Sequence, residues 1–160
     1  MKQRFGIAQA LLGNPRLIIV DEPTAGLDPE ERVRFHNLLS AIGQNVIVIL
    51  STHIVSDVSV LCRQMAIIHH GRVLVTGDPV GLVRELEGRL WRTTVDPADL
   101  PAFRERYQVI SERLFGGQTI VHVFSPERLG SSFEPVTPDL EDFYFATIKG
   151  IAVPQTAEVN

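Results

Sequence analysis

The sequence predicts an α/β fold for residues 1–88, in which helices flank a parallel sheet, followed by a small α+β domain in residues 89–150. Two observations predict the first part. Short apolar runs alternate with helical periods, and two of these runs, Leu17–Val20 and Val46–Leu50, contain no polar residue. Such runs are typical of parallel strands buried on both faces between helices. The second part is predicted by its own order of strand, helix, strand, strand and helix.

Helical periods and their end signals define the elements of residues 1–62. Residues 1–12 form a first helix that Gly13-Asn14-Pro15 ends. A second helix begins at Asp28-Pro29, with Asp28 as the N-cap and Pro29 as the first helical residue, and ends at Gly43. Two apolar helix faces are expected from the spacing, one of Phe35, Leu38, Leu39 and Ile42, and one of Ile54, Val58, Leu61 and Cys62.

Strands and turns dominate the rest of the chain. Residues 65–68 and 72–75 form a hairpin around His70-Gly71, and a helix follows from Asp78-Pro79 to Gly88. In the second domain we expect strands at 90–95, 109–115 and 118–124. Gly116-Gly117 forms the turn between the last two of these strands. Helices are expected at 97–107 and from Thr137-Pro138 onward, and residues 151–160 form a loose tail.

Composition and charge exclude several classes of protein. The chain has 160 residues, of which 44% are hydrophobic, so it can bury a core. A net charge of −4 without any basic stripe argues against a nucleic-acid partner. No apolar run approaches the ~20 residues that a membrane-spanning helix needs. We expect no secretory signal, and the lone Cys62 indicates a reducing, cytosolic compartment.

Two adjacent carboxylates, Asp21 and Glu22, directly follow the first apolar strand. Ligands bind at the carboxyl ends of strands in open α/β sheets, and successive strand residues point in opposite directions. Asp21 could therefore hold Mg²⁺, and Glu22 could polarise a water for attack on a phosphoryl group. An acidic turn after a buried strand is the structural alternative.

Two further segments carry candidate site residues. His53, in Ser51-Thr52-His53, follows the second apolar strand, where it could reach a γ-phosphate or orient the attacking water. The alternative for His53 is a helix cap or a half-exposed side chain. Gly26, in Ala25-Gly26-Leu27-Asp28-Pro29, permits a left-handed turn, and helix capping alone accounts for Asp28.

The order of these motifs closely resembles the second half of the ATP-binding cassette ATPases, which implies a partial P-loop NTPase-type sheet. Leu17–Glu22 resembles their Walker B strand, with Asp21 as the Mg²⁺ ligand and Glu22 as the catalytic base. His53 matches their switch histidine, the second catalytic residue that the resemblance implies. The match covers residues 1 to about 88, a little over half of the chain.

The same resemblance implies an interface. Ala25–Asp28 resembles the D-loop, and Lys2–Leu11 resembles the helix after the signature sequence. Gly26, Asp28 and Gln3 are thereby expected at the nucleotide or at the dimer interface. The small α+β domain resembles the extensions of cassette subunits that pair with separate exporter permeases. ATP, Mg²⁺, a permease and a second ATPase subunit are the implied ligands and partners, at the inner face of the cell membrane.

The family's phosphate-binding loop is missing, because none of the twelve glycines precedes a lysine. The glutamine loop and the Leu-Ser-Gly-Gly signature are absent as well. We therefore expect a truncated cassette that neither binds nor hydrolyses ATP appreciably by itself.

Two other classes of function stay open from the residues alone. Asp21 after one strand and Ser51-Thr52 after the next is also the layout of a receiver-like phosphoacceptor domain. Such a domain needs a lysine after the following strand, where His69-His70 stands instead. In a non-catalytic interaction protein, the acids would only cap helices and the second domain would bind a partner.

Overall fold

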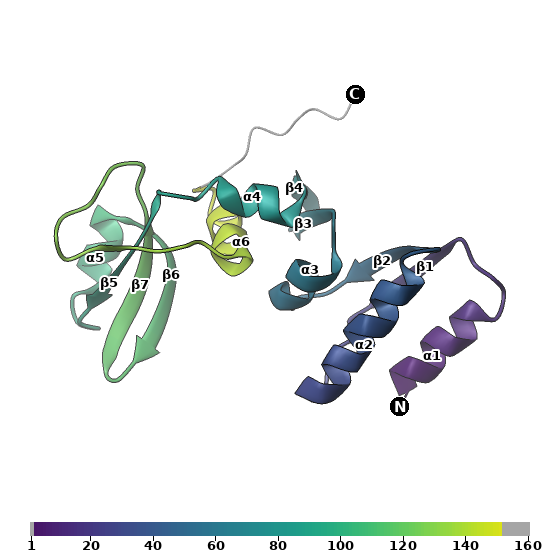
Figure 1. Cartoon of the computed structure of the whole chain (residues 1–160). Helices are drawn as coiled ribbons and strands as arrows, with labels where there is room; N and C mark the ends of the chain where they lie inside the picture. The colour runs from purple at the N-terminus through teal and green to yellow at the C-terminus, as the bar shows by residue number, and fades with distance from the viewer. Residues whose placement is uncertain (1, 152–160) are drawn as a thin grey trace, which may run out of the picture. The chain divides into compact units, whose positions relative to one another are not determined.

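The computed structural model describes residues 2–151, without the side chains of residues 2–4 and 7. The chain divides into two compact units, Met1–Cys62 and Arg63–Asn160 (Figure 1). Apart from residue 151, the tail predicted at 151–160 lies outside the described residues. No helix in the described part of the chain is both long enough and apolar enough to span a bilayer.

The first unit is built on a pair of parallel strands. Its elements are α1 (Lys2–Leu11), β1 (Leu17–Asp21), α2 (Pro29–Ile42), β2 (Ile47–Ser51) and α3 (Val55–Leu61). The register of β1 and β2 runs from Leu17 opposite Ile47 to Asp21 opposite Ser51, so both strands end at the same edge. The parallel pairing that the two apolar runs predict is confirmed.

Helices cover one face of this strand pair. Phe35 and Leu39 of α2 are buried, and Val20, Val48 and Leu61 pack against them. On the opposite face, four apolar side chains remain 46–67% exposed: Leu17, Ile19, Ile47 and Ile49. The prediction that both strands are buried on both faces was therefore wrong, since the helices of the described unit contribute to a single core on one side.

Helix α2 begins where its capping signals predict. The Asp28 carboxylate accepts a hydrogen bond from the backbone N–H of Glu31 at 2.8 Å, and Pro29 is the first helical residue. The helix ends at Gly43, whose N–H donates to the Leu39 carbonyl. Leu38, predicted on the inner face, is 38% exposed, whereas Phe35 and Leu39 are buried.

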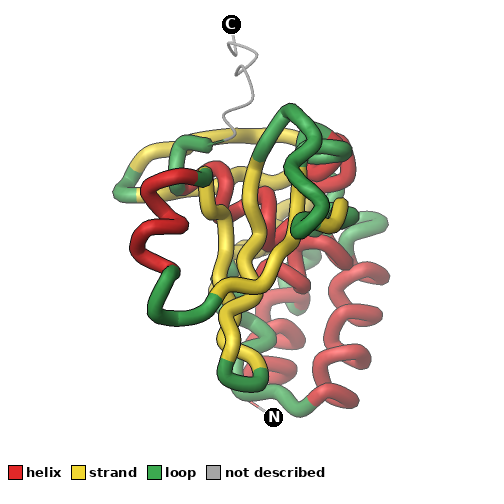
Figure 2. Tube along the Cα trace, turned by 90° about the vertical axis from the view of Figure 1, so that its left-hand side faces the viewer, coloured by secondary structure: helices red, strands yellow, loops and turns green. Residues whose placement is uncertain are grey.

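As far as residue 151, the second unit contains a hairpin, a four-stranded antiparallel sheet and three helices. Its elements are β3 (Met65–His69), β4 (Arg72–Gly77), α4 (Pro79–Arg84), β5 (Leu90–Val95), α5 (Leu100–Arg106), β6 (Gln108–Phe115), β7 (Gln118–Phe124), β8 (Glu134–Pro135) and α6 (Leu140–Ile148). The sheet has the order β6-β7-β5-β8, and its long strands run side by side in Figure 2. His70 and Gly71, both with positive φ, form the predicted turn between β3 and β4.

Two clusters of apolar residues hold the second unit together. Val95, Val109, Val121 and Val123 form one core, which residues of α5 and Phe133 cover. Phe143 of α6 and Leu86 after α4 are fully buried, and α6 packs against α4 and β6. Because of this packing, residues 63–88 belong to the second compact unit. That the cassette part of the chain ends at residue 88 is a separate prediction, which the packing does not test.

One exposed ion pair of this unit gives a pH-dependent prediction. Arg104 on α5 donates two hydrogen bonds to the Glu112 carboxylate on β6, at 2.7 and 2.5 Å. These hydrogen bonds lower the pKa of Glu112. Because the folded-state pKa lies below the unfolded one, the pair stabilises the folded unit above the unfolded pKa. That stabilisation is lost as the pH falls through the lowered folded pKa.

The coupling between Arg104 and Glu112 is measured with a double-mutant cycle of Arg104→Gln and Glu112→Gln. Urea unfolding followed by the fluorescence of Trp91, the single tryptophan, reports on this unit. We expect a coupling free energy at neutral pH that vanishes in acid. Equal coupling in acid and at neutral pH would contradict the assignment.

Candidate functional site

The site forms at the carboxyl ends of β1 and β2. Asp21 and Ser51 are the last residues of these strands and lie opposite each other. The backbone N–H of Glu22 donates to the Ser51 carbonyl at 2.8 Å, which continues the ladder by one residue. The two predicted acids therefore stand where the strands end, with the Asp21 side chain exposed to solvent.

Glu22 and His53 are in direct contact at this edge. One carboxylate oxygen, Oε1, accepts from the backbone N–H of His53 at 2.9 Å and contacts its Nδ1 at 2.7 Å. An ionised carboxylate only accepts hydrogen bonds, so a hydrogen bond between these two atoms needs the proton of His53 on Nδ1. Glu22 also has a φ of +45°, a left-handed backbone that is uncommon outside glycine and asparagine.

The arrangement suits an acid–base centre beside a cation ligand. Glu22 has a histidine partner that holds its orientation, and the His53 ring is 77% exposed at the strand edge, where a substrate could contact it. Among the described residues, no group of three or more His, Cys, Asp or Glu could hold a metal ion by itself. Mg²⁺ is commonly held by one or two carboxylates together with substrate phosphates, so Asp21 fits as one ligand of such an ion.

The loop between β1 and α2 contains the other predicted residues. Gly26 has a φ of +75°, which confirms the left-handed turn, and two tight turns connect Ala25 to Glu22 and Leu27 to Thr24. The Asp28 carboxylate is engaged in capping α2. Gln3 lies in α1, but its side chain is outside the described ones.

A buried acid next to this loop was missed from the sequence. Asp57 on α3 is fully buried, and its carboxylate accepts a hydrogen bond from the hydroxyl of Thr24. It also contacts Nε of Arg32 at 3.0 Å and Nε2 of His36 at 3.0 Å. Burial, and then the negative charge of Asp57, raise the pKa of the Cys62 thiol, which disfavours the reactive thiolate form.

A signal for Asp57 was present in the helical spacing. Asp57 stands three residues after Ile54 and four before Leu61, within the stripe that was predicted to face the core. A carboxylate at such a position needs buried partners, because an unpaired buried charge is strongly unfavourable. Its partners lie on other elements, so they could not be named from the sequence.

Comparison with known proteins finds relatives in one group, while no protein-family model matches. Nod factor export ATP-binding protein I from Rhizobium etli is 31% identical over 154 residues, covering 90% of this chain and 49% of that protein. The protein of the same description from Rhizobium sp. strain N33 is 41% identical over 91 residues, covering 53% and 28%. The one from Burkholderia thailandensis is 33% identical over 125 residues, covering 72% and 40%.

The structural comparison gives a more distant likeness. A solved metal-chelate type ABC transporter in an inward-facing conformation has a TM-score of 0.46 and 20% identity. That match covers 84% of this chain and 46% of the other, and it is too loose to define the fold.

Fold and site define an α/β protein with an acid pair and a histidine at the carboxyl edge of parallel strands. With the relatives named above, the chain belongs to the ATP-binding cassette (ABC) transporter ATPases. It spans about half the length, or less, of the curated relatives it matches.

Proposed function

We propose that this chain is the C-terminal part of an ABC exporter ATPase subunit and contributes the hydrolytic edge of its nucleotide site. The observation that carries the proposal is the contact between Glu22 and His53 at the ends of two parallel strands, directly beside Asp21. An acid, its histidine partner and a cation ligand at one sheet edge are what phosphoryl transfer to water requires.

Each site residue then has a definite task. Glu22 accepts the proton of the attacking water, and His53 holds the Glu22 carboxylate in place and faces the γ-phosphate. Asp21 would hold Mg²⁺, which when bound neutralises charge that develops on the phosphate oxygens. The loop with Gly26 and Asp28 and the helix with Gln3 would face the nucleotide or a second ATPase subunit.

The groups that bind the phosphates of ATP must lie outside this chain. Backbone N–H groups of a glycine-rich loop and its lysine hold the phosphates in P-loop proteins, and no Gly-Lys pair occurs in the sequence. Coupling to transport would need a separate permease, which would hold the subunit at the inner face of the membrane. The names of the relatives, export ATP-binding proteins, support this assignment.

A receiver-like phosphoacceptor is less well supported. The strand that follows β2 in the chain is β3, and β3 pairs with β4 in a separate sheet. A receiver-like domain would need a lysine after this strand, and His70 occupies that position in the sequence. No contact in the described residues favours this alternative.

A chimera tests the proposed function. Residues 1–160 replace the matching segment of the Rhizobium etli relative, which restores a complete phosphate site around Asp21, Glu22 and His53. We expect the chimera to bind and hydrolyse MgATP, whereas the 160-residue chain by itself does neither. ATP binding is measured by calorimetry and turnover by phosphate release. Tight MgATP binding by the chain alone, or an inactive chimera that binds ATP, would contradict the proposal.

A further inference from the structure

We propose that Asp57 is a positioning residue, whose buried carboxylate fixes the contact between Glu22 and His53. This inference rests on the proposed function for its biological meaning. The contacts from which it is argued do not depend on that function. Neither the motifs nor the relatives assign a role to Asp57.

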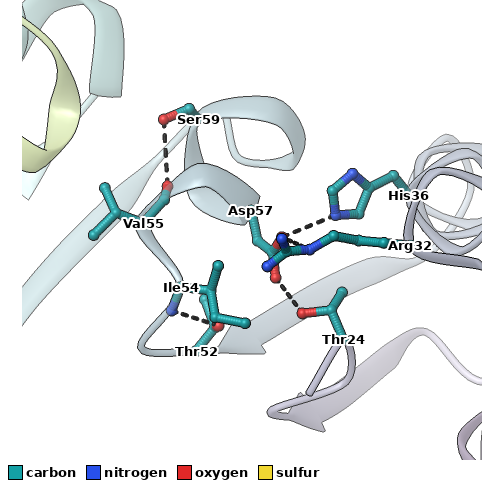
Figure 3. A network of polar contacts seen from close by, with 8 residues as sticks. All are labelled: Thr24, Arg32, His36, Thr52, Ile54, Val55, Asp57 and Ser59. Carbon is teal, nitrogen blue, oxygen red and sulfur yellow. Dashed lines mark hydrogen bonds and ion pairs between the residues drawn. The ribbon is translucent and has the colours of Figure 1, made fainter. Parts of the chain in front are cut away.

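The Asp57 carboxylate joins three elements of the first unit (Figure 3). It accepts from Thr24 Oγ1 in the loop after β1, and contacts Arg32 Nε and His36 Nε2 on α2, both at 3.0 Å. Asp57 itself belongs to α3 and has no exposed surface. The contact with Arg32 Nε is an ion pair without a hydrogen bond, so the Thr24 hydroxyl and the His36 ring are the hydrogen-bonding partners of this carboxylate. Its position is fixed, because a displaced buried carboxylate would lose partners that buried groups need.

Both members of the catalytic contact are tied to this carboxylate by short stretches of chain. Glu22 is two residues before Thr24, and only Pro23 separates them. His53 is four residues before Asp57, and α3 begins at Val55. A hydrogen bond between Thr24 and Asp57 thus fastens the end of one strand to the helix that follows the other.

The backbone of Glu22 explains why such a fastening is needed. A φ of +45° costs conformational free energy in residues other than glycine and asparagine, so surrounding contacts must hold Glu22 in this conformation. The Thr24 side chain is 2% exposed and directs its hydroxyl to Asp57, which anchors the loop just beyond Glu22. Release of that anchor should let the Glu22 backbone relax and draw its carboxylate away from His53.

The position of the proton on His53 reports this geometry in the chain itself. Contact with Glu22 requires the proton on Nδ1, whereas a free neutral imidazole favours Nε2. Nitrogen-15 NMR of the 160-residue chain at mildly alkaline pH distinguishes the two tautomers. We expect Nδ1–H in the wild type, and a loss of that signature in Thr24→Val and in Asp57→Ala, neither of which retains the hydrogen bond between these two side chains.

Two controls separate positioning from mere stability. Thr24→Ser keeps the hydroxyl and should retain the His53 signature. Asp142 is a second buried aspartate, in the other unit, whose Oδ1 contacts His122 Nδ1 at 2.7 Å. Asp142→Ala removes the acceptor of His122 Nδ1, so it should remove the Nδ1–H signature of His122 and leave that of His53 unchanged, which shows that the measurement detects such a loss.

Methyl resonances of Leu39 and Val48 show whether the core of the first unit is intact in each variant. If Thr24→Val disrupts that core, Thr24→Ala, which lacks the branched side chain, decides the matter. Retention of the wild-type His53 tautomer in a folded variant without the Thr24 hydroxyl would overturn the proposal, as would a wild-type chain with His53 in the Nε2–H form. A failure of the chimera to hydrolyse ATP would refute the proposed function and leave this result unaffected.

Discussion

Replacement of Glu22 by glutamine in the chimera is expected to lower the rate of ATP hydrolysis by about 10²–10⁴-fold, the usual contribution of a general base. The substitution keeps the shape of the side chain but removes its ability to take a proton from water. Binding of MgATP should be retained, because Glu22 contacts His53 and the strand edge, and the phosphate grip lies elsewhere. Single-turnover hydrolysis and equilibrium ATP binding measure the two effects separately.

Glu30→Gln is the matched control for this experiment. Glu30 also neighbours the loop, but it is exposed on the first turn of α2 and pairs with Arg34. Its replacement should leave both turnover and ATP binding unchanged. A Glu22→Gln chimera that hydrolyses ATP at the parental rate would show that the acid is structural, as in a non-catalytic interaction protein.

Truncation of Phe143 to alanine is expected to have the largest effect on the stability of the second unit. The Phe143 side chain is fully buried on α6, so its loss leaves a cavity in the core. Changes of this kind lower the free energy of unfolding by about 3–5 kcal/mol. Urea unfolding followed by Trp91 fluorescence measures the change, since Trp91 lies in the same unit and is 9% exposed.

Phe115→Ala provides the control for Phe143→Ala. Phe115 ends β6 beside the Gly116-Gly117 turn, and its side chain is 75% exposed. The same chemical change there should alter the free energy of unfolding by less than about 0.5 kcal/mol. Similar losses from both substitutions would mean that α6 does not pack into the core as the structure has it.

Much of the local structure was predictable, because its causes are local. Asp28 and Pro29 are adjacent to the helix they start, and two glycines between β-rich runs define the β6–β7 hairpin. The pairing of β1 with β2 followed from their apolar runs and from the helix between them. The start of the last helix was predicted slightly too early, at Thr137-Pro138, because Asp139 is the N-cap and α6 begins at Leu140.

The errors and omissions concern contacts between distant residues. An apolar strand such as Leu17–Val20 predicts burial, but the element that covers each face is decided elsewhere in the chain. The short strand β8 is not among the strands predicted from the sequence, because two residues carry no period and their pairing partner, β5, is far away in sequence. Asp57 was missed for the same reason, since Thr24 is 33 residues from it.

The candidate site has features that were predictable from local sequence and features that were not. Asp21, Glu22 and His53 could be placed at one sheet edge, because parallel strands present their carboxyl ends together. Whether Glu22 or Asp21 contacts the histidine depended on a backbone conformation that no propensity indicates. Their catalytic roles remain predictions that the chimera tests.

The left-handed backbone at Glu22 also bears on how this position tolerates change. Glycine would adopt the same φ without steric conflict, and asparagine would do so at a smaller cost than glutamate. A glutamate at this position therefore costs stability that glycine would not cost, and the contacts of its carboxylate with His53 have to offset that cost.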